Sequence, residues 1–154
     1  MDLLEEAEVL RKVPMFAKLE PSKLKLLAFT SEYQTFEDGE VLFHAGDPAD
    51  CAFVIISGEV EILANTDAGD VVLGVLGDNQ IFGELALLNK APRSATLRAK
   101  NRLQVLRIKD EVFLKLVTEN PDVALDLMHQ LSDKLALSHQ QVEALQSKLH
   151  RNGS

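Results

Sequence analysis

Between residues 32 and 108 the chain consists of short apolar runs separated by turns that contain glycine, such as Asp38-Gly39 and Ser57-Gly58. Runs of this length at near-regular spacing are typical of β-strands, and glycine allows the tight turns between them. Many short strands in succession predict a β-sandwich or a jelly-roll barrel. The expected strands are residues 33–36, 41–45, 52–57, 60–65, 71–76, 95–99 and 103–108, of which the last two would close the barrel.

Helical patterns lie on both sides of these strands. Residues 2–13 have the spacing of an amphipathic helix that stops at a proline, and a second short helix is expected at residues 23–29. After the strands, Asn120-Pro121 separates two further helices, of which the second is long. The predicted fold is α+β, with an N-terminal helical cap at residues 1–30, a β jelly-roll (double-stranded β-helix) barrel at residues 31–109 and C-terminal helices at residues 110–151.

Within the barrel, the segment at residues 81–99 has the features of an anion site. Gly83 allows a positive φ angle and a close backbone approach, and a helical turn that opens at Glu84 would direct unpaired N–H groups at an anion. Arg93 lies ten residues after Gly83 and can hold a phosphate or carboxylate through two parallel N–H bonds. This combination predicts an anion pocket.

Glu84 restricts what the pocket can bind, because its carboxylate would repel a bare anion. A suitable ligand therefore carries a phosphate for Arg93 and a hydroxyl or amine donor for Glu84, as a nucleotide with a free ribose hydroxyl does. The alternative is that Glu84 begins a helix and forms an ordinary salt bridge with Arg93 across a turn. The spacing alone leaves both interpretations open.

The segment FGELALLNKAPRSAT resembles the phosphate-binding cassette of cyclic nucleotide-binding domains. Residues 37–63 are similar to the strand-turn-strand pattern that precedes the cassette in that family, and the resemblance extends over about residues 16–147. It implies that Glu84 holds the ribose 2′-hydroxyl and that Arg93 holds the cyclic phosphate. The other implied phosphate neighbours are the amides of Gly83, Leu85 and Ala86 and the hydroxyl of Ser94.

The resemblance also bears on which base is bound. Family members that prefer cGMP often have threonine after the cassette arginine, whereas this chain has Ser94, so the cassette alone leaves cAMP and cGMP open. Ser138 lies where bacterial regulators of the family present a hydroxyl to the base, and Leu73 would form an apolar wall. Together these residues favour cAMP. The alternative for Ser138 is a hydroxyl that bonds back to its own helix.

The long C-terminal helix carries an apolar stripe whose members step alternately by three and four residues. Such a stripe is typical of a coiled-coil seam and predicts a parallel homodimer, with the same helix acting as a lid near the ligand. The alternative is a helix that packs only on its own barrel, which suits its first turns. The stripe consists of Met128, Leu131, Leu135, Ser138, Val142, Leu145 and Leu149.

The net charge of −8 disfavours a DNA-binding surface, since affinity for DNA comes largely from lysine and arginine. The segment after the last helix ends at Ser154, so no helix-turn-helix is expected within this sequence. No membrane-spanning run or signal peptide is visible, which favours the cytoplasm. Cys51 cannot form an internal disulfide and is expected to be a strand residue, with a reactive thiol as the alternative.

A jelly-roll barrel also raises the possibility of a metal-dependent enzyme. Only His44 of the four histidines lies in the predicted barrel, and no catalytic triad or carboxylate pair is apparent, so neither a metal site nor catalysis is expected. The predicted function is a cyclic nucleotide sensor that needs no cofactor besides its ligand and acts on an unidentified effector protein. The alternative is an interaction module that keeps the fold and dimerises without a ligand.

Overall fold

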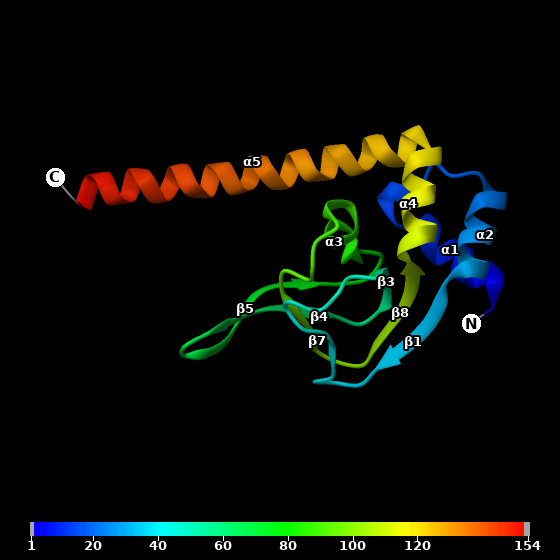
Figure 1. The fold of residues 1–154 in the computed structure, drawn as a ribbon, viewed down its shortest axis with the longest axis horizontal. Coiled ribbons are helices and arrows are strands. Elements are labelled where there is room, and N and C mark those ends of the chain that lie inside the picture. Colours follow the sequence, from blue (N-terminus) through cyan, green and yellow to red (C-terminus); the bar gives the residue numbers. More distant parts are fainter. Residues whose placement is uncertain (1, 153–154) are drawn as a thin grey trace.

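The computed structural model describes residues 2–152, together with their side chains except those of residues 134–139, 141–142 and 149–152. Short N-terminal helices lead into a two-sheet β-roll, and a pair of C-terminal helices follows (Figure 1). The last of these helices extends far beyond the roll as one uninterrupted rod (Figure 1). This order of elements agrees with the α+β prediction.

The N-terminal helices begin where their sequences favour a first turn. Helix α1 (Leu3–Arg11) starts after Asp2, whose side chain accepts a hydrogen bond from the Glu5 amide at 2.9 Å. A 3₁₀ turn, η1 (Pro14–Phe16), follows, and α2 (Pro21–Thr30) has proline at its first position. Both predicted N-terminal helices are therefore confirmed.

The strands form two antiparallel sheets with the orders β1-β8-β3-β6 and β2-β7-β4-β5. Pairs β1–β8, β2–β7, β3–β6 and β4–β5 are nested one inside the next, which is the pairing of a jelly roll. The strands are β1 (Glu32–Phe36), β2 (Val41–Phe43), β3 (Cys51–Ser57), β4 (Val60–Thr66), β5 (Gly69–Leu76), β6 (Ile81–Phe82), β7 (Thr96–Ala99) and β8 (Leu103–Lys109).

Two details of the sheets differ from the sequence prediction. The barrel is not closed, because β7 and β8 lie inside the two sheets and each sheet keeps its own edge strands. The apolar pair Ile81–Phe82 forms a short strand, β6, that pairs with β3 and brings the cassette to the sheet. All seven strands expected from the sequence are present, with ends that differ by a few residues.

Strands β3 and β8 are buried on both faces and join the β-roll to the helices. Phe53 and Val105 point into the roll, where they belong to one apolar core. The adjacent residues Val54 and Leu106 point to the other side and pack with Phe113 in a second core beneath the helices. Because successive strand residues alternate between faces, these two strands fill both cores.

Strand β5 contains a bulge in its pairing with β4. Ile62 pairs with Gly74 and Leu63 pairs with Val72, so Leu73 is an extra residue on β5. The side chain of Leu73 is 64% exposed. The β4–β5 hairpin projects away from the rest of the roll (Figure 1).

Asn120 forms the corner between α4 (Asp110–Glu119) and α5 (Pro121–Asn152). Its backbone carbonyl accepts a hydrogen bond from the Val123 amide at 3.0 Å, in the first turn of α5. Its side-chain oxygen accepts a hydrogen bond from Nζ of Lys23 on α2 at 2.7 Å. The start of the long helix is thus fixed to the N-terminal cap.

Among the described side chains of α5, the buried ones lie in its first turns. Val123 and Leu127 belong to the core beneath the helices, whereas Met128 is 58% exposed and Leu145 is 61% exposed. Among residues 2–152, none of the helices combines the length and the apolar character that crossing a bilayer requires. Four of the predicted seam residues have side chains outside the described part of the chain: Leu135, Ser138, Val142 and Leu149.

The turn between β3 and β4 contains a glycine whose replacement should lower the free energy of unfolding. Gly58 has a φ angle of 101°, and a Cβ atom there would overlap the carbonyl oxygen of Arg102. Gly39 has a similar φ angle of 86° with nothing within 4 Å of its would-be Cβ. We expect Gly39→Ala to lower the free energy of unfolding by about 1–2 kcal/mol, the cost of the left-handed backbone alone.

Gly58→Ala should lower the free energy of unfolding by roughly a further 1–3 kcal/mol, because the backbone must also shift to relieve the overlap. Urea denaturation of both variants measures the difference. Equal stabilities for the two variants would show that the contact with Arg102 is unimportant.

Candidate functional site

Gly83 forms the turn between β6 and the short helix α3 (Glu84–Asn89). Its φ angle of 82° lies in the left-handed region that glycine adopts most readily. A Cβ atom at this position would lie 2.6 Å from Nη1 of Arg93. A side chain at residue 83 would therefore strain the backbone and displace the arginine.

The guanidinium group of Arg93 is held by two separate backbone segments. Its side chain is buried, with Nη1 donating to the carbonyl of Gly83 at 2.9 Å and Nη2 donating to the carbonyl of Cys51 at 2.6 Å. Among the described residues, its Nε has no hydrogen-bond partner although it is buried. A buried donor without an acceptor is costly, so this arginine is suited to receive another acceptor.

One ring of a small aromatic cluster lies against the arginine. The Cζ atom of Arg93 lies 4.2 Å from the ring centroid of Phe43, a cation–π contact. Phe43 lies 6.1 Å from Phe53, and Phe53 stacks on Phe82 at 5.1 Å between centroids. These apolar surroundings reduce the screening of the arginine charge and strengthen its attraction for an anion.

Cys51 contacts the same arginine and is buried. Its Sγ lies 3.5 Å from Nη2 of Arg93. Burial, together with a hydrogen bond to Asp50, raises the pKa of the Cys51 thiol to about 11. The thiol is therefore protonated at neutral pH, which supports a structural role and argues against a reactive nucleophile.

The remaining cassette residues lie in or next to α3. Glu84 is the first residue of this helix and is 3% exposed, and Leu85 and Ala86 follow it in partly buried positions. Ser94 is exposed and directly follows Arg93. The cassette thus places a buried carboxylate, a buried guanidinium and a helical turn within one short segment.

The two residues expected at the base are less closely defined. Leu73 lies exposed on β5, outside the buried cluster around Arg93. The side chain of Ser138 lies outside the described part of the chain, although its backbone belongs to α5. The assignment of these residues to the base stays a prediction.

A pocket of about 530 Å³ opens beside the arginine. Its polar side chains include Arg107, which is paired with Asp50 at 3.0 Å and with Glu32 at 3.4 Å. The charge of Arg107 is therefore already compensated, and Arg93 remains the buried cation of this region. The other lining residues are Gln34, Phe36, Leu42, Phe43, Asp47, Pro48, Cys51 and Phe53.

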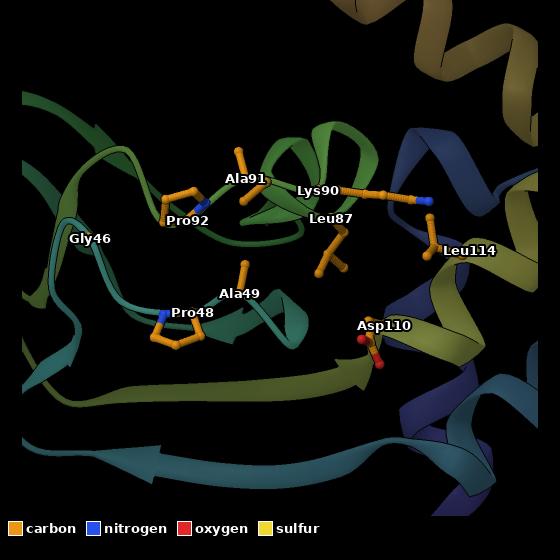
Figure 2. Close-up of a pocket in the computed structure, with 10 residues that line it drawn as sticks. Gly46, Pro48, Ala49, Leu87, Lys90, Ala91, Pro92, Asp110 and Leu114 are labelled. Atoms are coloured by element: carbon orange, nitrogen blue, oxygen red, sulfur yellow. The ribbon is translucent and has the colours of Figure 1, made fainter.

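A second pocket, of about 550 Å³, lies between the cassette and α4, and its lining includes neither Glu84 nor Arg93. Figure 2 shows Leu87 of α3 and Leu114 of α4 on the same side of this pocket, with the side chain of Lys90 extending towards Leu114. Lys90 ends α3 with a φ angle of 51°, an uncommon conformation for lysine. This pocket is lined by Ala86, Leu87 and Lys90 of the cassette segment, but not by the charged pair Glu84 and Arg93.

The residues that the structure describes contain no group of three or more His, Cys, Asp and Glu side chains that could hold a metal ion. His44, the histidine of the predicted barrel, lies next to Asp47 at 3.9 Å and is exposed.

The family model of the cyclic nucleotide-binding domain matches residues 33–120, which include most of β1, the cassette and α4. The chain belongs to the cyclic nucleotide-binding domain family. The chain is 32% identical over 113 residues to a cAMP-dependent protein kinase regulatory subunit from Mycosarcoma maydis, with 70% of the chain and 22% of that protein covered. It therefore corresponds to less than a quarter of the length of that relative.

Solved structures support the same family. The sensor domain of the transcriptional regulator DNR from Pseudomonas aeruginosa superposes with a TM-score of 0.79 at 27% identity, over 92% of this chain and 93% of that one. The regulatory domain of Toxoplasma gondii protein kinase A, solved with cAMP, has a TM-score of 0.68 at 26% identity, over 73% of this chain and 43% of that one. The fold of this domain is thus found in regulatory proteins.

Two parts of the arginine environment could not be identified from the sequence. Phe43 contacts Arg93 through its ring, and Cys51 does so through its backbone carbonyl. The aromatic residue was visible as part of a strand, but its partner depends on how β2 pairs with β7. A carbonyl contact leaves no signal in the sequence, because every residue has a carbonyl.

Proposed function

We propose that this domain binds a cyclic nucleotide, preferably cAMP, and acts as a regulatory sensor without catalytic or DNA-binding activity of its own. The observation that carries the proposal is the buried Nε of Arg93, which lacks an acceptor among the described residues. A cyclic phosphate supplies negatively charged oxygens that an arginine holds with two parallel hydrogen bonds. Because Nε is covered, the guanidinium and its neighbours shift slightly when the phosphate enters.

The other cassette residues complete the proposed ligand contacts. Glu84 accepts a hydrogen bond from the ribose 2′-hydroxyl, and the amides of Gly83, Leu85 and Ala86 face the phosphate together with the Ser94 hydroxyl. The burial of Glu84 supports this role, since a buried carboxylate strongly favours a ligand group that donates a hydrogen bond to it. No cofactor takes part. The T. gondii regulatory domain, which is similar to this chain, was solved with cAMP.

The preference for cAMP over cGMP rests on Ser138 and Leu73, which we propose to meet the base. A location in the cytoplasm belongs to the same proposal. It is supported by Cys51, a free cysteine of the kind that reducing compartments preserve.

We further propose that two copies of the domain pair through α5. The exposed Met128 and Leu145 lie on this helix, and Val71, Val72 and Leu73 are exposed on the projecting hairpin. Apolar side chains in such numbers on extended elements are typical of an interaction surface. They also favour the second candidate function, an interaction module that dimerises through the same surface without nucleotide.

Replacement of Arg93 tests the phosphate contact. Arg93→Ala leaves the phosphate unpaired in an apolar environment, so we expect cAMP affinity to fall about a hundredfold or more, or roughly 3–5 kcal/mol. Titration calorimetry with cAMP and cGMP measures it. Arg102→Ala is the control, because the Arg102 side chain is 69% exposed and has no proposed contact with the ligand. A folded Arg93→Ala variant with wild-type affinity would refute the assignment.

The role of Glu84 is tested with 2′-deoxy-cAMP, which lacks the hydroxyl. We expect the wild type to bind it about ten- to a hundredfold more weakly than cAMP, as a charge-assisted hydrogen bond is worth roughly 1.5–3 kcal/mol. Glu84→Gln should lose affinity for cAMP and lose little more for the deoxy ligand. Equal binding of both ligands by the wild type would remove the ribose contact from the proposal.

Truncation tests the dimer. A chain that ends at Leu135 lacks most of the proposed seam, so we expect light scattering to report a monomer where the full chain forms a dimer. Circular dichroism should show that the β-roll remains folded. If cAMP contacts the same helix, dimer affinity should rise when cAMP is added. A full chain that stays monomeric at high concentration, with and without cAMP, contradicts the proposal.

A further inference from the structure

A groove of about 400 Å³ lies between α2 and α4, on the helical side of the molecule and away from the cassette. Its walls are apolar, with Leu26 and Leu27 contributed by α2 and Val112 and Leu116 contributed by α4. The hydroxyl of Thr30, a polar group of the lining, donates to the carbonyls of its own helix at 3.0 Å. Apolar side chains therefore dominate the floor of the groove.

Apolar surface continues beyond the groove on α2. Leu26 is 63% exposed and Phe29, one turn further along the helix, is 75% exposed. A small molecule that filled the groove would leave Phe29 uncovered. The surface therefore suits an occupant longer than a small ligand, such as a helix that lies along α2 and α4.

The charges around the groove indicate the chemistry of this occupant. Lys23 and Lys115 line it together with Glu119, and Lys25 follows on α2, which contains no acidic residue. Neither Lys25 nor Lys115 forms an ion pair with a described residue. The lining thus carries two lysines and one carboxylate in a chain with a net charge of −8, and this small local excess of positive charge favours an acidic partner.

One end of the groove reaches the beginning of α5. Lys23 and Asn120 both line it, and the hydrogen bond between them joins α2 to the corner that precedes the long helix. An occupant at this end therefore contacts the residues that set the direction of α5. A partner bound in the groove would therefore lie next to the start of α5, the helix through which we propose that two copies of the domain pair.

We propose that the α2–α4 groove is the docking site for an effector, which inserts a short acidic amphipathic helix. Apolar residues of this helix, one turn apart, cover Leu26 and Phe29, and its carboxylates lie near Lys115 and Lys25. The inference rests on the proposed regulatory function, since it names the surface that the effector reads. Docking itself does not require that the cassette hold a nucleotide.

The test is a selection from a displayed library of random 16-residue helical peptides, with the full chain as target and with and without cAMP. We expect enriched peptides to carry apolar residues at spacings of three and four and more acidic than basic residues. Fluorescence anisotropy then measures the affinity of the best peptide. We expect Leu26→Glu to weaken binding about tenfold or more, and Lys115→Ala to weaken it about threefold, with a larger effect at low salt.

Leu4→Glu is the matched control, because Leu4 on α1 is 62% exposed, almost the same as Leu26. It should leave peptide affinity unchanged, and Phe29→Glu should reproduce the effect of Leu26→Glu. The proposal is overturned if no peptide is enriched, if the enriched peptides are basic, or if Leu26→Glu has no effect. It is also overturned if the full chain self-associates through this groove, with Leu26→Glu abolishing that association.

A separate calorimetric titration with cAMP distinguishes the two proposals. Peptide binding without cAMP binding refutes the nucleotide assignment and leaves the docking surface in place. Binding of cAMP without peptide binding refutes the docking surface alone.

Discussion

The two hydrogen bonds that Arg93 donates to the carbonyls of Gly83 and Cys51 hold the centre of this domain together. They join three segments that are distant in sequence: the loop before β7, the turn before α3 and the start of β3. Both carbonyls belong to residues whose positions are fixed, Gly83 by its left-handed turn and Cys51 by its pairing in β3. The guanidinium is thus oriented by backbone rather than by flexible side chains. Apart from the slight shift that uncovers Nε, the proposed phosphate site is preorganised, which favours binding because little ordering remains to be done when the ligand arrives.

The same geometry connects the site to the helices. Cys51 begins β3, and β3 is buried on both faces, so a displacement of Arg93 acts on a strand that packs against the roll on one side and the helical core on the other. Leu87 of α3 also belongs to the helical core, where it accompanies Phe113 of α4. The pocket between the cassette and α4 separates parts of these two helices (Figure 2). Cassette and helices therefore meet through a few apolar contacts, with space beside them into which either can move.

The order and type of most elements could be predicted from the sequence, because seven of the strands are short apolar runs bounded by turn residues and the long helices have a clear start or stop. The two-residue strand β6 and the 3₁₀ turn η1 were too short to give such a pattern. Gly83, Glu84 and Arg93 could also be identified, since the cassette is continuous in sequence. The edges of the two sheets could not be predicted, because they depend on which strands pair across long distances in the sequence. The exposure of Leu73 follows from a bulge in β5 that only the register with β4 reveals. The contacts of Arg93 with Phe43 and Cys51 were hidden for the same reason: both arise from tertiary packing.

The length of α5 has a mechanical consequence. A helix of 32 residues is about 48 Å long, and among its described side chains those that pack in the helical core lie in the first turns, just after the Asn120 corner. It therefore behaves as a lever whose fulcrum is the Asn120 corner. A tilt of about 10° at that corner would sweep the far end through roughly 8 Å, given the rise of the helix. Rearrangements at the scale of a single hydrogen bond, such as that between Lys23 and Asn120, are thereby amplified into displacements larger than a side chain.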